Sequence, residues 1–305
     1  MKKKTVRGNL LLLLTAFIWG SAFVAQSVGM DYVGPFTFNF MRNTIGGLVL
    51  IPCIALLNRI DPARRQAKSG EEREKVRRVL FTGGLCCGAV LFVASSLQQF
   101  GLKYTAAGKA GFITALYIVF VPVLGIFLKK KISPAVWVAV GVSAVGLYLL
   151  SIQEDFTMGT GDIYVCLCAV CFAVHILVID HFSPLVDGVK MSCIQFFTAG
   201  ILSGVAALLF EKPVMGDILR CWLPILYAAI LSSGVAYTLQ IVAQRDVKPA
   251  AASLLMSMES VFAALSGAVL LHERFTVREI TGCILVFGAV LLAQLPEMCR
   301  RKIQD

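Results

Sequence analysis

Three ionisable side chains lie inside long apolar stretches of this 305-residue chain, namely Glu259, Arg42 and His175. Such a group costs about 2.5–3.5 kcal/mol in a membrane-spanning helix unless it is paired or hydrated. Glu259 lies about nine residues into its stretch, or about 14 Å at 1.5 Å per residue. At that depth a carboxyl group can bind substrate or carry a coupling proton. It can equally be a buried carboxyl satisfied by hydrogen bonds between helices.

The other two groups also have two interpretations each. Arg42 lies about 12 Å inside the second apolar stretch, where it either lines a cavity or makes a structural ion pair. His175 lies in the sixth stretch and is either a cavity residue or a packed histidine with satisfied hydrogen bonds. The sequence leaves both questions open.

Polar and aromatic side chains recur at helical spacing in these stretches. Ser233, Tyr237, Gln240 and Gln244 are spaced i, i+4, i+7 and i+11, which places them on one face of a helix. Facing lipid would be costly, so such faces contact protein or water. Tight helix packing explains a single stripe, whereas several related stripes favour a hydrated cavity. The candidate substrate-binding residues are Trp19, Gln26, Asn39, Arg42, His175, Gln195, Tyr237, Gln240 and Glu259.

Two further patterns point only weakly to other chemistry. Gly159–Asp162 spells the GxGD string of intramembrane aspartyl proteases, which need two carboxylates meeting within the membrane. Asp162 is predicted at the surface, where it fits a helix N-cap. Cys168, Cys171 and His175 share a face and could hold a soft metal, but no fourth ligand is evident. We therefore expect no enzyme, no metal and no cofactor.

Composition predicts the elements that position these residues. Residues of the AVILMFWYC set make up 58% of the chain and charged residues only 15%, which is typical of a polytopic membrane protein. We predict an all-α integral membrane protein with ten transmembrane helices and no soluble domain. The predicted spans are 9–28, 34–57, 77–100, 107–128, 133–151, 161–181, 190–210, 221–243, 250–271 and 277–296.

The basic residues are unevenly distributed over the connections between these spans. With the N-terminus inside, 21 of the 28 Lys and Arg residues fall in the inside segments and 6 in the outside ones. The positive-inside rule then predicts that both termini are cytoplasmic. The excess of basic residues at helix ends is better explained in this way than by nucleic-acid binding.

The chain also contains an internal repeat. Residues from 9 onward align with those from 162 onward at an offset of 153, and after the long second loop the offset becomes 143. The predicted domains are 9–151 and 161–296, with five helices each. Because five is odd, the second copy must lie inverted in the membrane. Two inverted five-helix repeats are the architecture of secondary transporters, with substrate bound between the halves near the midplane.

The second copy carries a family signature. The segment from Lys248 to Gly267, KPAAASLLMSMESVFAALSG, followed by LHERF at 271–275, resembles the end of an EamA domain of the drug/metabolite transporter superfamily. Trp19-Gly20-Ser21 and Arg42 match the opening of the repeat, and the first copy has Leu116 at the place of Glu259. The resemblance implies a central cavity lined by helices 1–4 and 6–9, with helices 5 and 10 at the periphery.

Together these patterns predict a secondary transporter of small metabolites, such as amino acids or related compounds, that works by alternating access. Export is implied by the resemblance to the family, since the sequence itself does not give the direction. A passive facilitator or exchanger is the alternative, and an intramembrane protease a remote one. We expect a small-molecule substrate, a lipid bilayer and protons as coupling ion, but no nucleic acid. The expected location is a bacterial cell membrane. Oligomeric state cannot be read from the sequence.

Overall fold

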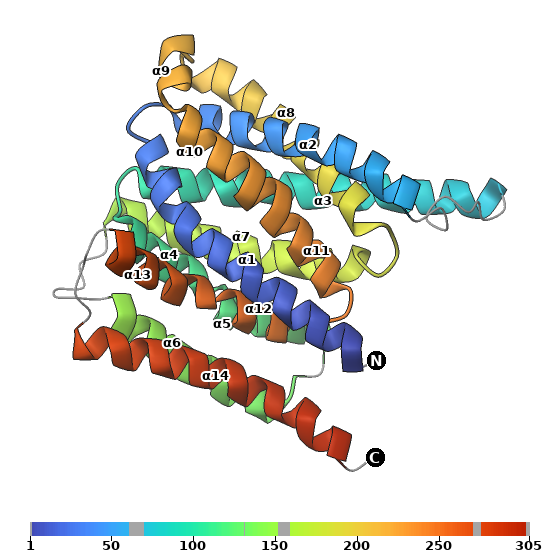
Figure 1. The fold of residues 1–305 in the computed structure, drawn as a ribbon, viewed down its shortest axis with the longest axis vertical. Helices are drawn as coiled ribbons and strands as arrows, with labels where there is room; N and C mark the ends of the chain where they lie inside the picture. The colour runs from blue at the N-terminus through green and yellow to red at the C-terminus, as the bar shows by residue number, and fades with distance from the viewer. Residues whose placement is uncertain (1, 61–69, 131, 152–158, 271–275, 303–305) are drawn as a thin grey trace.

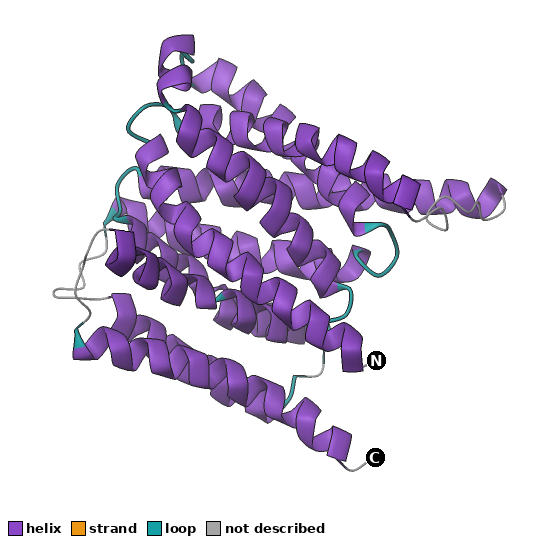
Figure 2. Ribbon diagram, in the orientation of Figure 1, coloured by secondary structure: helices purple, strands orange, loops and turns teal. Residues whose placement is uncertain are grey.

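The computed structural model describes residues 2–60, 70–130, 132–151, 159–270 and 276–302. Within these residues every regular element is a helix and no strand occurs (Figure 2). The predicted all-α class is confirmed. The part of the family signature at 271–275, and Lys131, lie outside the described residues.

The first half of the chain forms five predicted spans from six helices. They are α1 (Lys2–Gly29), α2 (Pro35–Ile60), α3 (Gly70–Leu102), α4 (Ala107–Ala115), α5 (Tyr117–Phe127) and α6 (Pro134–Ser151). Two of them begin earlier than predicted, α1 at Lys2 and α3 at Gly70. In α3 the added turns are charged and largely exposed. Glu71 and Glu72 lie in its first turn, where their negative charges interact favourably with the positive end of the helix dipole.

The second half forms the other five spans. Its helices are α7 (Thr160–Phe182), α8 (Gly188–Phe210), α9 (Met215–Arg220), α10 (Trp222–Tyr227), η2 (Ala228–Tyr237), α11 (Thr238–Gln244), α12 (Pro249–Met256), α13 (Met258–Leu270) and α14 (Val277–Lys302). In the described part of the chain, eight helical segments are long and apolar enough to cross a membrane. The two shorter apolar helices, Pro134–Leu149 and Ile280–Ala293, occupy the remaining two predicted spans.

The helices are arranged around a central group (Figure 1). Helices α2, α3 and α8 lie along one side, and α6 and α14 lie side by side along the opposite side. This agrees with the peripheral fifth and tenth helices that the resemblance implied. Both termini lie at the same end of the molecule, which we call the terminus face, as an even number of crossings requires.

Gly20 brings the two halves into direct contact in the centre. A Cβ added at Gly20 of α1 would lie 2.6 Å from the backbone oxygen of Glu259 and 2.8 Å from the backbone nitrogen of Ala263, both in α13. Only glycine allows the two backbones to approach so closely. As a consequence, Trp19 and Glu259 lie beside each other on neighbouring helices.

Three spans depart from a continuous α-helix, which the sequence analysis did not predict. The fourth span breaks at Leu116 (φ −61°, ψ −9°) and the ninth at Ser257 (φ −62°, ψ −13°). In the repeat alignment these two positions lie within two residues of each other. The eighth span contains the ten-residue π-helix η2. Interrupted helices in membranes occur where backbone lines a cavity, and π-helical turns are frequent at functional sites.

Candidate functional site

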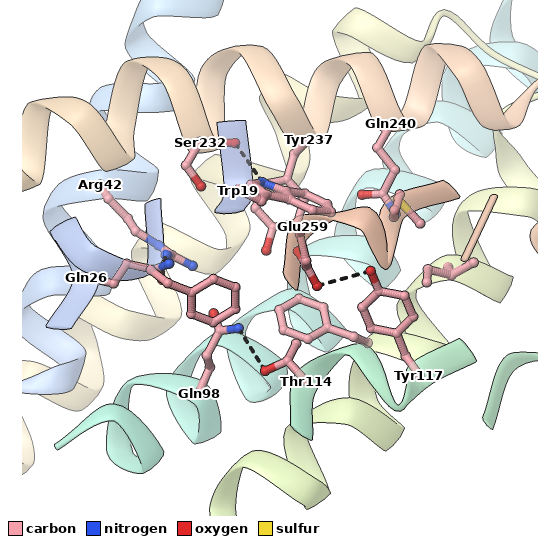
Figure 3. A pocket seen from close by; sticks show the side chains of 14 residues that line it. Trp19, Gln26, Arg42, Gln98, Thr114, Tyr117, Ser232, Tyr237, Gln240 and Glu259 are labelled. Atoms are coloured by element: carbon pink, nitrogen blue, oxygen red, sulfur yellow. Dashed lines mark hydrogen bonds between the residues drawn. The ribbon is translucent and has the colours of Figure 1, made fainter. Parts of the chain in front are cut away.

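A small pocket, with about 30 Å³ of free space, lies in the centre of the helix group, at the points where these helices are interrupted. We call it the central pocket. Most of its lining side chains are buried, so it is closed to both faces in this conformation. The lining residues are Trp19, Phe23, Gln26, Arg42, Gln98, Thr114, Tyr117, Phe172, Ile176, Ser232, Tyr237, Gln240, Met256 and Glu259 (Figure 3).

Glu259 lies in the first turn of α13, directly after the break at Ser257. Tyr117 is the first residue of α5, directly after the break at Leu116, and its hydroxyl donates a hydrogen bond of 3.1 Å to Glu259 Oε1. The two breaks therefore bring the two side chains together (Figure 3). Within the described residues Glu259 forms no ion pair, although it is only 3% exposed. A carboxyl group in this position is available to a ligand or a proton.

Arg42 enters the same pocket from α2 and is 1% exposed. Its Nη1 donates a hydrogen bond of 2.6 Å to Oε1 of Gln26, which also accepts one of 2.7 Å from Nε2 of Gln99. Nε and Nη2 of Arg42 form no hydrogen bond within 3.5 Å among the described residues, although Tyr237 lies close enough to interact with the guanidinium. These two nitrogens form one edge of the guanidinium, the edge that can bind a carboxylate through two parallel hydrogen bonds.

Aromatic rings form a further wall of the pocket. The rings of Trp19 and Tyr237 lie 4.6 Å apart between centroids, and the Trp19 indole N–H donates to the Ser232 carbonyl at 3.4 Å. Ser232 and Tyr237 are five residues apart in η2, and both line the pocket because a π-helix repeats at about that spacing. Ser233, which the sequence placed in this stripe, instead faces α2, where a Cβ on Gly46 would meet it at 2.9 Å.

Six of the nine candidate residues line the central pocket, namely Trp19, Gln26, Arg42, Tyr237, Gln240 and Glu259. Asn39, His175 and Gln195 are fully buried but lie outside its lining. His175 Nε2 and Gln195 Oε1 are hydrogen-bonded at 3.0 Å, and the His175 ring contacts Tyr237 edge-on with centroids 6.0 Å apart. The repeat aligns Gln195 with Arg42 but His175 with Ala22, so the partner of Gln195 lies one helical turn from the position equivalent to Gln26.

Other lining residues were not singled out from the sequence. Gln98 Nε2 donates to Thr114 Oγ1 at 3.4 Å, and Tyr117 holds Glu259. Gln98 and Gln99 are two adjacent amides in a predicted membrane span, and this pattern could have identified Gln98 as a candidate pocket residue from the sequence. Tyr117 gave none, because its role depends on the break at Leu116.

The carboxylate of the GxGD string lies elsewhere and has another role. Asp162 is the third helical residue of α7, not its N-cap as predicted; the N-cap is Gly159, whose N–H donates to Asp162 Oδ2 at 2.9 Å. Asp162 also accepts from Lys109 Nζ at 2.7 Å and Thr105 Oγ1 at 2.9 Å. Glu259 is thus the only carboxylate among the described residues that line the central pocket. In that described part, no group of three His, Cys, Asp or Glu side chains is placed to hold a metal ion.

Comparison with known proteins agrees with this architecture. A family model described as "EamA-like transporter family" matches the chain twice, over residues 6–152 and 159–295. An "Uncharacterized transporter" of Archaeoglobus fulgidus is 30% identical over 302 residues, covering 96% of this chain and 87% of the relative. The "Uncharacterized transporter YoaV" of Bacillus subtilis is 20% identical, covering 98% and 100%.

A solved crystal structure shows the same fold. Its TM-score is 0.74 at 20% sequence identity, with 98% of this chain and 99% of the other covered. Eight long and two shorter apolar helices surround the central pocket in the described part of the chain, and two successive matches to one transporter model assign the chain to the EamA-like transporter family of the drug/metabolite transporter superfamily.

Proposed function

We propose that the protein is a secondary transporter that exports small zwitterionic metabolites, amino acids or related compounds, through the central pocket. The observation that carries this proposal is a guanidinium and a carboxyl group that line one pocket without pairing with each other. Two nitrogens of Arg42 form no hydrogen bond within 3.5 Å there, and Glu259 has no ion-pair partner among the described residues. When the carboxyl group is ionised, the two groups are complementary to a ligand bearing both signs.

Each part of such a ligand has a matching group. The free edge of Arg42 fits a carboxylate, and Glu259 fits an ammonium group. Trp19, Tyr237, Phe23 and Phe172 supply apolar surface for a side chain. Pockets of this kind, apolar with a few placed polar groups, bind small molecules and fix their orientation.

We further propose alternating access, with the repeats 9–151 and 161–296 moving against each other. The breaks at Leu116 and Ser257 support this, because each divides a span at the central pocket and allows its two parts to change angle independently. Closure of the pocket on both sides matches an intermediate of such a cycle.

Protons are the proposed coupling ion, with Glu259 as the group that carries them. A proton and a substrate ammonium group would compete for the same carboxyl, so that one leaves when the other binds. Coupling then follows from the different affinities of the two conformations for each of them.

Reconstitution in liposomes with an imposed pH gradient tests the proposal. A panel of amino acids, nucleosides and organic cations is screened for compounds that make the protein dissipate the gradient. We expect amino acids to do so, and Glu259→Gln to abolish the proton flux while Glu74→Gln, at the exposed start of α3, leaves it unchanged.

Two outcomes contradict parts of the proposal. Labelled amino acids that cross without proton movement would indicate a facilitator or exchanger. Dissipation by nucleosides or organic cations alone would exclude the zwitterion as substrate class.

A further inference from the structure

A second hollow, of about 340 Å³, opens near the terminus face, where α11 ends. Its lining includes Thr5 of α1, Asp180 of α7, Gln244 of α11 and the connection that follows α11, with Arg245, Asp246 and Lys248. We call it the terminus-face hollow. None of the functional roles described above uses it.

The wall between this hollow and the central pocket is one helical turn thick. On α7, Ile176 lines the central pocket and Asp180, four residues on, lines the hollow. On α11, Gln240 and Gln244 are divided between the two spaces in the same way. Four residues of helix span about 6 Å. On both helices, therefore, about 6 Å separates a residue that lines the central pocket from a residue that lines the hollow.

Gln244 closes this wall with a single hydrogen bond. Its Nε2 donates to the carbonyl oxygen of Ile176 at 3.1 Å. The side chain is 2% exposed, and its Oε1 has no partner among the described residues. A polar ligand that passes can replace this one hydrogen bond with its own, and the free Oε1 of the amide can accept a further bond from the ligand.

The opposite face is held by more contacts between the two halves. Lys109 and Thr105 of the first half both bind Asp162 of the second. Glu211, at the end of α8, accepts the backbone N–H groups of Phe36 and Thr37 at the start of α2, at 2.9 and 2.8 Å. The thin wall is therefore on the side of the terminus face.

The charges around the hollow have both signs. Arg245, Asp246 and Lys248 are exposed, and Asp180 is paired with Lys130. A small zwitterion can bind such a set of charges with either end, whereas a molecule of single charge meets repulsion from half of it.

We propose that the terminus-face hollow is a second, peripheral binding site for small zwitterions, and that Gln244 is the gate between it and the central pocket. This inference rests on the proposed transport function for its ligand class. The position of the gate rests on the geometry alone.

Transport kinetics in oriented proteoliposomes test the peripheral site. The double variant Arg245→Gln/Asp246→Asn should raise KM for a radiolabelled amino acid offered at the terminus face about five-fold, as expected from two solvent-exposed charges. KM at the opposite face should stay unchanged, which also shows that the variant folds. The control Lys212→Gln/Asp217→Asn removes a similar pair near α9, at the opposite face, and should leave the terminus-face KM unchanged. If the double variant changes KM equally at both faces, or at neither face, the proposed peripheral site is wrong.

A thiol-labelling experiment tests the gate without any substrate. In a Gln240→Cys variant, a membrane-impermeant thiol reagent is added at the terminus face and modification of position 240 is followed by mass spectrometry. Adding Gln244→Ala should speed the modification about ten-fold, whereas adding Gln99→Ala, away from the wall, should not. Equal rates with and without Gln244→Ala would overturn the gate. If the parent protein transports no zwitterion, the proposed function and the ligand class fail, and this labelling still decides the gate.

Discussion

The proposed binding of a carboxylate in the central pocket depends on a single side chain, Arg42. Gln26 fixes one of its terminal nitrogens, and Gln99 fixes Gln26 in turn. The remaining edge of the guanidinium is therefore preoriented toward the pocket. Arginine is suited to this task because its planar fork binds both oxygens of a carboxylate, which the single ammonium group of lysine cannot do.

Arg42→Lys therefore tests geometry separately from charge. Loss of one charged hydrogen bond should raise KM for an amino acid substrate about 10- to 100-fold. Uptake kinetics in proteoliposomes measure this change. Arg59→Lys, at the exposed end of the same helix, is the matched control and should change KM by less than about two-fold. An unchanged KM in Arg42→Lys would show that substrate binding depends on the positive charge and not on the geometry of the guanidinium.

Residue types alone located the chemistry but not every contact. Glu259 and Arg42 stood out because ionisable groups are rare and costly inside membrane helices. Tyr237 and Gln240 followed from helical spacing. Asn39, His175 and Gln195 were equally polar in sequence, yet they lie outside the pocket lining, because the sequence does not say on which side of a neighbouring helix a polar face packs.

At the scale of elements, the start of α2 depends on a residue from the other half of the chain. Gly34 precedes the helix, and its carbonyl accepts the first helical hydrogen bond from Phe38. A side chain there would normally cap the free N–H groups. Here Glu211 does so from α8, and a Cβ on Gly34 would overlap its carboxylate. Glycine at this position leaves room for the carboxylate, and any larger residue would displace it.

This borrowed cap predicts coupled effects on stability. Gly34→Ala and Glu211→Ala should each lower the free energy of unfolding by about 1–2 kcal/mol, because either change removes the cap. The double variant should be no less stable than Glu211→Ala, since the added methyl group then has room. Thermal unfolding in detergent measures the difference. Gly141→Ala, where a Cβ meets no neighbour, is the control. Additive losses in the double variant would contradict the shared cap.

Element positions were predictable where hydropathy decides them, and local backbone form was not. All ten predicted spans are helical in the described residues. Three of the helices begin at Pro35, Pro134 and Pro249, as expected from the preference for proline at the first helical position. The breaks at Leu116 and Ser257 and the π-helix η2 have no such mark. These features depend on packing around the pocket. Because η2 is wound as a π-helix, Ser232 lines the pocket where α-helical spacing predicted Ser233.

For the whole molecule, the repeat determined the topology. An odd number of crossings in each half places both termini at one face, as Figure 1 shows. Which side of the membrane that face occupies is a prediction from the basic residues alone.

Fusion of reporters to the C-terminus checks this orientation. In a bacterial host, a fluorescent protein fused there should fluoresce, and alkaline phosphatase fused there should stay inactive because it requires the oxidising side of the membrane. A phosphatase fused after Lys212, near α9, should be active. The reverse pattern would place the termini outside and would also reverse the side on which the terminus-face hollow opens.

The backbone of the two halves is related by the repeat, but their chemistry is not. Gln195 stands at the place of Arg42, and Leu116 at the place of Glu259. If the side chains followed the repeat, the two end states of the proposed alternating-access cycle would be related by a two-fold rotation and equal in energy. Each charged side chain occurs in one half only, so the two end states differ in energy. In the proposed cycle the empty protein therefore has a preferred resting state, and transport in the two directions need not be equally fast.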